Sequence, residues 1–204
     1  MRRTVLLLLA VGVTGCARQV YSSAPRPAET RPAPPAVKPA VVDPVSSTEA
    51  VDYLLARGML IPVVGVSVGQ LHDTFDEGRD GGRVHRALDI LAPRGTPVLS
   101  ADSGRILRVS TNSLGGNIIY ATDPLGRVVY YYAHLDAYQP GLTQGAMVAR
   151  GDTLGFVGTT GNAPKDTPHL HFQVMRMPSD GKYWDGEPIN PYPLILLSHD
   201  SVRP

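Results

Sequence analysis

Two histidines separated by one residue are the strongest local sign of chemistry in this sequence. His169 and His171 flank Leu170 in a segment with the character of a β-strand. Residues i and i+2 of a strand project from one face about 6.6 Å apart, so both imidazoles would enter one pocket. One imidazole could bind a metal ion while the other contacts the water bound to that ion. Taken alone, the pattern is equally compatible with a coincidence on the surface.

A second segment places a histidine and a carboxylate four residues apart, as His85 and Asp89. In a regular strand their Cα atoms would be about 13 Å apart, which is too far for one metal ion. They converge only if the chain bends between them, with Asp89 beginning a strand and His85 in the preceding loop. Gly78, Gly81 and Gly82 give that loop the necessary freedom. The alternative is a solvated histidine and an aspartate at a strand edge.

A third histidine, His134, follows the most aromatic predicted strand, 128–133. A lone histidine at a strand end is usually structural, but here it adds to a larger set. Two histidines and one carboxylate with an open fourth position are a common catalytic zinc set. Such a zinc ion lowers the pKa of its bound water to roughly 7 and polarises a carbonyl oxygen. Further histidines at the pocket edge could accept the proton and stabilise the oxyanion.

The elements that must position these residues are predicted to be short β-strands. The 204 residues include 21 Gly and 19 Pro, a content that suits turns and disfavours a helical bundle. Turn-forming residues such as those at 123–126 separate the apolar runs. We therefore predict a mainly β fold, with an antiparallel β-sheet folded on itself as a sandwich or barrel-like layer. The predicted strands are 88–91, 97–101, 105–110, 117–121, 128–133, 153–157 and 169–175.

A short helix is predicted immediately before this β domain. Ser46 and Glu49 have the spacing of a capping box, Leu54 lies on the apolar face, and Gly58 is placed to end the helix. We assign the helical segment to 46–61, the β domain to 62–197 and a polar tail, which contains His199, to 198–204.

The N-terminus has the features of an export signal. Arg2 and Arg3 precede residues 5–13, which are all apolar or glycine and too few for the about 20 helical residues that span a bilayer. The run ends before Cys16 in a sequence that resembles a bacterial lipobox, in which the cysteine is lipidated and becomes the mature N-terminus. The alternative is an ordinary signal peptide with an incidental cysteine, although a free thiol would be a liability in an oxidising compartment.

Residues 16–45 are predicted to be a lipid-anchored tether that follows a signal peptide at 1–15. Their prolines, set among Ala, Val, Ser and Arg, favour extended chain with too few apolar side chains for a core. In the Gram-negative lipoproteins that this segment resembles, an aspartate after the cysteine usually means retention in the inner membrane. Ala17 therefore favours the outer membrane, and we expect an envelope protein that faces the periplasm.

Charge and cysteine content exclude several classes of protein. The chain has 19 Lys and Arg against 18 Asp and Glu, a net charge of +1, which argues against a nucleic-acid partner. A single cysteine excludes an intramolecular disulfide, a CxxC redox pair and a Cys-rich zinc knuckle.

Five ordered segments resemble the LytM/lysostaphin-type zinc metallopeptidases, which cut the peptides of peptidoglycan. By that resemblance His85, Asp89 and His171 are ligands of one zinc ion, and His134 and His169 are catalytic histidines beside the water. The segments are 85–90, 92–98, 132–135, 151–155 and 168–172.

The resemblance also implies a groove floored by an antiparallel sheet, with walls that include 76–84 and 162–168. Tyr183 and Trp184 are expected to close the sheet edge or, alternatively, to line this groove.

One position departs from the family pattern, which usually has glycine two residues after the first ligand histidine. That position is Ala87 here. If the bend between the histidine and the aspartate needs a positive φ at this residue, alanine would cost roughly 1 kcal/mol or more relative to glycine. A subset of the family has alanine there, so we interpret Ala87 as a variant.

The function implied by the resemblance is that of a membrane-anchored zinc endopeptidase acting on peptide cross-links of peptidoglycan. Stem peptides would be its substrate, with His134 or His169 as the general base. A Gram-negative setting suggests D-alanyl–diaminopimelate cross-links. The alternative is a non-catalytic LytM-like regulator that binds and activates a murein amidase; such regulators have typically lost ligand residues, whereas all five positions are filled here. A simple peptidoglycan-binding module, the third hypothesis, has no use for an open zinc site.

Overall fold

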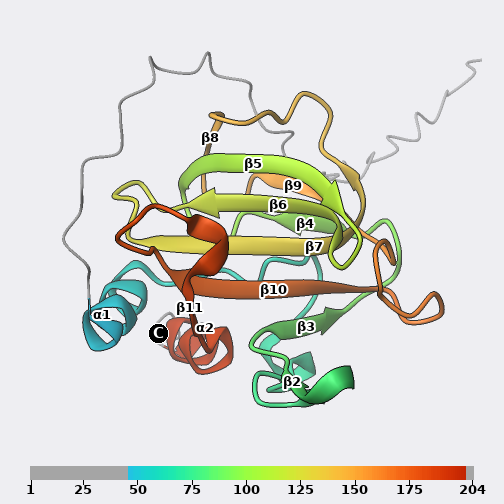
Figure 1. Ribbon diagram of the computed structural model, residues 1–204, viewed down its shortest axis with the longest axis horizontal. Helices are drawn as coiled ribbons and strands as arrows, with labels where there is room; N and C mark the ends of the chain where they lie inside the picture. Colours follow the sequence, from blue (N-terminus) through green and yellow to red (C-terminus); the bar gives the residue numbers. More distant parts are fainter. Residues whose placement is uncertain (1–45, 201–204) are drawn as a thin grey trace, which may run out of the picture.

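The computed structural model describes residues 46–200 of the chain as a β-sheet domain with a helix near each end (Figure 1). The predicted signal peptide 1–15, the tether 16–45 and Cys16 lie outside the described residues. Within residues 46–200, no helix has both the length and the apolar character that crossing a membrane requires.

The first helix, α1 (Ser47–Arg57), begins and ends where its capping residues predict. Ser46 Oγ accepts a hydrogen bond from Glu49 N at 3.2 Å, and Glu49 Oε2 accepts one from Ser46 N at 2.8 Å. This reciprocal pair satisfies amide groups that a helix leaves without partners at its start. Gly58 ends the helix with φ 66°, which glycine adopts without steric cost. The predicted capping box is therefore confirmed.

Nine strands form one antiparallel sheet, which confirms the predicted mainly β fold. Six of them lie in the order β11-β10-β7-β6-β5-β8, while β3 pairs with β10 and β9 pairs with β4 and β7. A separate small sheet joins β1 and β2. The strands are β1 (Gly78–Arg79), β2 (Arg83–Val84), β3 (Leu88–Leu91), β4 (Pro97–Leu99), β5 (Gly104–Asn112), β6 (Gly116–Thr122), β7 (Val128–Tyr138), β8 (Met147–Val148), β9 (Thr153–Val157), β10 (His169–Arg176) and β11 (Glu187–Ile189). Short 3₁₀ helices are η1 (Val68–Gln70), η2 (Asp80–Gly82) and η3 (Tyr183–Asp185).

Strand β7 joins two parts of this sheet. Its residues 128–133 pair with β10, whereas its residues 135–138 pair with β9, which Figure 1 shows behind the main sheet. His134 lies between the two parts with φ 62°. The prediction that this strand ends at 133 is therefore wrong. The left-handed residue turns the strand onto a new partner instead of ending it, so His134 lies inside a strand and not at its end.

A second helix, α2 (Pro191–Asp200), replaces part of the predicted tail. Leu194 and Ile195 are buried in the core, and this burial holds the segment against the domain. Pro191 is compatible with the helix because the first turn needs no amide donor there. His199, expected in a polar tail, therefore lies in the last turn of a helix.

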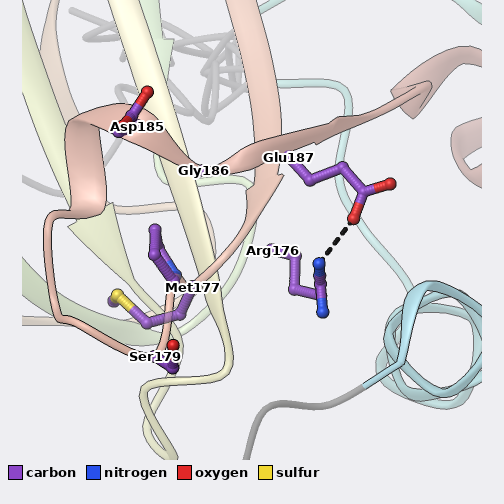
Figure 2. Close-up of a pocket in the computed structure, with 7 residues that line it drawn as sticks. Arg176, Met177, Ser179, Asp185, Gly186 and Glu187 are labelled. Atoms are coloured by element: carbon purple, nitrogen blue, oxygen red, sulfur yellow. Dashed lines mark hydrogen bonds and ion pairs between the residues drawn. The ribbon is translucent and has the colours of Figure 1, made fainter.

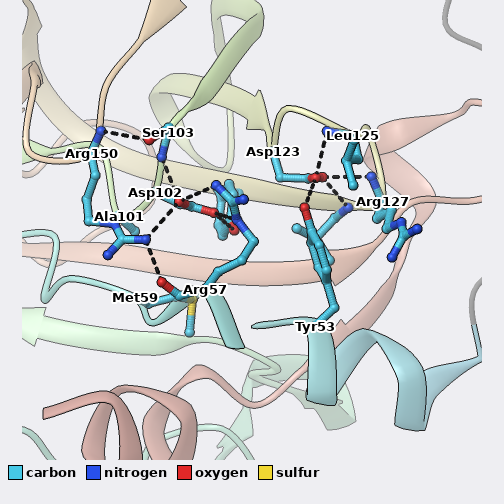
Figure 3. Close-up of polar contacts among 12 residues, drawn as sticks. Tyr53, Arg57, Met59, Ala101, Asp102, Ser103, Asp123, Leu125, Arg127 and Arg150 are labelled. Atoms are coloured by element: carbon cyan, nitrogen blue, oxygen red, sulfur yellow. Dashed lines mark hydrogen bonds and ion pairs between the residues drawn. The ribbon is translucent and has the colours of Figure 1, made fainter. Parts of the chain in front are cut away.

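Helix α1 is fixed to one face of the sheet by two buried carboxylates (Figure 3). Asp102, whose side chain is fully buried, accepts hydrogen bonds from Arg57 Nε at 2.5 Å and from Tyr130 Oη at 3.0 Å. Tyr53 Oη donates to Asp123 Oδ2 at 2.5 Å. Successive residues of a strand point to opposite faces, so the residue after Tyr130 faces away from α1. Helix α1 thus covers the face of the sheet opposite the one to which Tyr131 points.

Candidate metal centre

A left-handed residue brings His85 and Asp89 together. His85 Nε2 lies 3.0 Å from Asp89 Oδ1. Asp89 lies in β3, whereas His85 lies four residues earlier, in the segment before this strand. The bend falls on Arg86, which has φ 58° and whose amide donates to the Phe75 carbonyl at 2.8 Å. Ala87 is fully buried and does not have a positive φ. The strain that the sequence placed at the alanine therefore lies one residue earlier.

Pairing of β3 with β10 adds His171 to the same point. His171 is the partner of Asp89 in the strand register. Its Nδ1 lies 3.2 Å from Asp89 Oδ1 and 2.9 Å from His85 Nε2. Each of the three residues offers one donor atom, and these atoms all lie within 4.8 Å of one another. Two imidazole nitrogens and one carboxylate oxygen at such spacing match the donor set of a catalytic zinc site.

Backbone carbonyls orient three of the histidine rings. The Nδ1 atoms of His85, His134 and His169 lie 2.8–2.9 Å from the carbonyl oxygens of Thr74, Thr160 and Thr167, respectively. A carbonyl only accepts, so each Nδ1 must carry the proton. In the neutral form of each ring the lone pair is therefore on Nε2, as metal ligands and general bases require.

His134 and His169 flank the cluster from two strands. Their ring centroids are 5.0 Å apart, the His134 and His171 rings are 5.6 Å apart, and His169 Nε2 lies 3.8 Å from Asp89 Oδ1. Burial and the neighbouring His171 lower the pKa of His134 to about 4. His134 is therefore a neutral base at physiological pH. Its left-handed φ is held by a hydrogen bond from its amide to the Gly115 carbonyl at 2.7 Å.

The two carboxylate oxygens of Asp89 have different partners. Oδ1 faces the histidines, whereas Oδ2 accepts a hydrogen bond from Arg79 Nη2 at 2.7 Å. Arg79 also donates from Nη1 to Glu77 Oε2 at 2.8 Å. Although burial raises the pKa of Asp89, the neighbouring His171 and His85 rings hold it far below its ordinary value. Asp89 is therefore ionised, with one oxygen reserved for the cluster.

Arg79 is the residue that sequence reasoning missed. Arg79 lies in β1, within the segment expected to form a groove wall. It is ten residues from Asp89, and no helix or strand period predicts a contact at that separation. Only the β1–β2 pairing, in which Arg79 is opposite Arg83, brings the guanidinium back to the carboxylate.

The structure thus brings together all five residues predicted for the site, from β3 with its preceding loop, β7 and β10. A separate cavity of about 360 Å³ lies in the β10–β11 connection, and none of the five residues lines it (Figure 2). Its lining includes Arg176 and Glu187, which form an ion pair at 2.7 Å. This cavity is therefore distinct from the histidine cluster.

Comparisons with known proteins match the domain that carries the cluster. The model of peptidase family M23 matches residues 83–191. The L-Ala--D-Glu endopeptidase of Bacillus subtilis is 34% identical over 104 residues, 48% of this chain and 32% of that protein. The DD-carboxypeptidase/endopeptidase Mpg of Neisseria meningitidis is 34% identical over 114 residues, 56% of this chain and 23% of that protein. The chain therefore spans about a third or less of the length of these two relatives.

Among solved structures, a putative glycyl-glycine endopeptidase lytM from Ruminococcus gnavus has a TM-score of 0.54 and 30% identity. The similarity covers 64% of this chain and 54% of that chain.

Proposed function

Because this chain belongs to peptidase family M23, we propose that it is a zinc metallo-endopeptidase that hydrolyses the peptide cross-links of peptidoglycan. The observation that carries the proposal is the convergence of His85, Asp89 and His171 on one point, with His134 and His169 beside it. The peptidase names of two relatives support a peptide substrate.

The proposed ligands of one zinc ion are His85 Nε2, His171 Nδ1 and Asp89 Oδ1. When bound, the zinc ion supplies Lewis acidity to a scissile carbonyl and lowers the pKa of a water molecule. Arg79 engages Asp89 Oδ2, so the carboxylate offers a single oxygen and leaves room for water and substrate.

The two remaining histidines, His134 and His169, transfer the proton of the attacking water in this proposal. A backbone carbonyl oxygen holds the Nδ1 proton of each, so the proton exchanged during the reaction is carried on Nε2. Either His134 or His169 accepts the proton of the attacking water and returns it to the leaving amine. The partner histidine, 5.0 Å away between ring centroids, hydrogen-bonds the developing oxyanion when its own Nε2 carries a proton.

The setting that we propose is the bacterial envelope. Cys16 is the lipidation site, the chain is anchored through it facing the periplasm, and the outer membrane is favoured over the inner. The N-terminal sequence pattern supports this anchoring.

Metal analysis and digestion of cross-linked muropeptides by the full-length chain test the peptidase proposal. We expect about one zinc ion per chain and chelator-sensitive cleavage, both lost in Asp89→Ala. Asp152→Ala is the matched control, because that carboxylate only caps a turn by accepting from Ala149 N at 2.8 Å. Wild-type cleavage by Asp89→Ala would sink the proposal. Zinc binding without any cleavage, together with activation of an added murein amidase, would instead establish the regulator.

A further inference from the structure

Four aromatic side chains continue from the histidine cluster across the same face of the sheet. The Tyr131 ring lies 6.0 Å from the His171 ring and 4.6 Å from the Tyr120 ring. Tyr183 lies 5.2 Å from Tyr120, and Trp184 lies 5.0 Å from Tyr183. We refer to Tyr131, Tyr120, Tyr183 and Trp184 as the aromatic row.

The outer half of the aromatic row comes from the β10–β11 connection. Figure 1 shows this connection, with η3, in front of β6 and β7. The edge of the sheet is formed by β11, so Tyr183 and Trp184 do not close it, contrary to the first expectation from the sequence. They extend the face that holds the histidines.

The aromatic row is not part of the hydrophobic core. Tyr130 and Tyr132, on the other face of β7, are at most 1% exposed and build the core. The members of the row are all partly or largely exposed, and Trp184 is 56% exposed. An aromatic surface that folding leaves in water and that leads to a catalytic cluster is available to a ligand.

We propose that the outer half of the aromatic row, Tyr183 and Trp184, is a subsite for the pyranose rings of the glycan strand, so that the enzyme binds a stem peptide along Tyr131 and Tyr120 together with its sugar. This inference rests on the proposed function. The electron-rich face of an aromatic ring attracts the weakly positive C–H bonds that a pyranose presents on one side.

The length of the row agrees with this assignment. The three ring separations from His171 to Tyr183 limit the distance between these two rings to about 16 Å, which about four or five extended residues cover. A stem peptide is a short chain of this kind between the sugar and the cross-link. With a cross-linked bond at the histidines, the sugar would therefore be within reach of Tyr183 and Trp184.

The polar groups beside Trp184 suit sugar hydroxyl and acetamido groups. Lys182 and Asp185 are exposed neighbours of Tyr183 and Trp184 in the chain. Lys182 Nζ pairs with Asp180 Oδ2 at 2.8 Å, so its charge is balanced within the same connection.

Trp184 provides a direct measurement of binding, because it is the single tryptophan of the chain. Titration of the full-length protein with tri-N-acetylchitotriose should give a saturable change of tryptophan emission. Tyr183→Ala should weaken this binding about tenfold, a loss in the range that one aromatic contact contributes. The control is Leu125→Ala, in the β6–β7 turn, because Leu125 is an apolar residue about as exposed as Trp184. This variant should bind the sugar like wild type. Absence of a saturable change in the wild type would overturn the proposal.

Cleavage kinetics separate this inference from the proposed function. We expect Trp184→Ala to lower kcat/KM about tenfold on a muropeptide dimer that carries its sugars. The same variant should cleave the sugar-free peptide dimer at the wild-type rate. Equal losses on both substrates would refute a sugar subsite. If the wild type cleaves neither substrate, the peptidase proposal fails while the fluorescence titration still decides the subsite.

Discussion

Replacing Ala87 by glycine should destabilise the protein, although it restores the residue that is usual in the family. Ala87 is fully buried and has no positive φ. The variant loses a buried methyl group, about 0.8 kcal/mol, and gains backbone freedom in the unfolded chain, about 0.5–1 kcal/mol. The free energy of unfolding should therefore fall by about 1.5 kcal/mol.

The matched variant is Arg86→Gly, because Arg86 holds the left-handed conformation. Relief of φ 58° is worth about 1–2 kcal/mol. Against this, glycine adds unfolded-state freedom and removes the contact of the guanidinium with the Phe75 ring, 5.2 Å away, which together cost about 1–2 kcal/mol. The ion pair with Asp76 is exposed and contributes little. The net change should be close to zero.

Equilibrium urea unfolding measures both variants, and chelator competition measures their zinc affinity. We expect a clear loss of stability for Ala87→Gly and little change for Arg86→Gly, with zinc bound by both. A stability gain or tighter zinc binding in Ala87→Gly would show that the bend strains residue 87, and the reasoning would be wrong.

Three further perturbations test other parts of the structure. Arg79→Ala should weaken zinc binding about tenfold by freeing one oxygen of Asp89, and chelator competition giving a wild-type affinity would contradict this. In the folded chain the pKa of His134 is lowered to about 4, whereas in the unfolded chain it is about 6.5. As the pH falls from about 6.5 to about 4, the unfolded chain therefore binds a proton that the folded chain does not, and the free energy of unfolding should decrease. In urea unfolding, His134→Gln should show a smaller fall, and an equal fall would argue against the buried neutral ring. Asp102→Asn removes the counter-charge of Arg57 and should lower the free energy of unfolding by roughly 3 kcal/mol without changing zinc affinity; a loss below about 1 kcal/mol would contradict the buried pair.

The elements with strong local signals could be predicted from the sequence. The capping box at Ser46 and Glu49 fixes the start of α1, and β3 and β9 have the predicted bounds. Four short strands were not predicted, because two or three residues are too few for an alternating pattern: β1, β2, β8 and β11. Helix α2 was not predicted because its run of leucine and isoleucine, which follows two prolines, lacks the polar positions that define a helical period.

The five site residues could be found from their types and spacing, but the geometry that joins them could not. The approach of His85 to Asp89 depends on the dihedral of Arg86, which belongs to a residue type that rarely adopts a positive φ. The contact of Arg79 with Asp89 depends on the pairing of a two-residue strand. Both are set by tertiary structure, which a single sequence does not encode as a local pattern.

Strand β7 sets the orientation of His134 separately from the arrangement of the proposed metal ligands. The proposed ligands belong to β3, its preceding loop and β10, which pair directly with each other. The orientation of His134, in contrast, also depends on the pairing of residues 135–138 with β9. Local opening at β9 would therefore turn His134 away while the proposed metal ligands stay assembled. Under the proposed function, a partly unfolded copy would therefore bind its metal ion without cleaving its substrate, and damage of this kind would inactivate the protein.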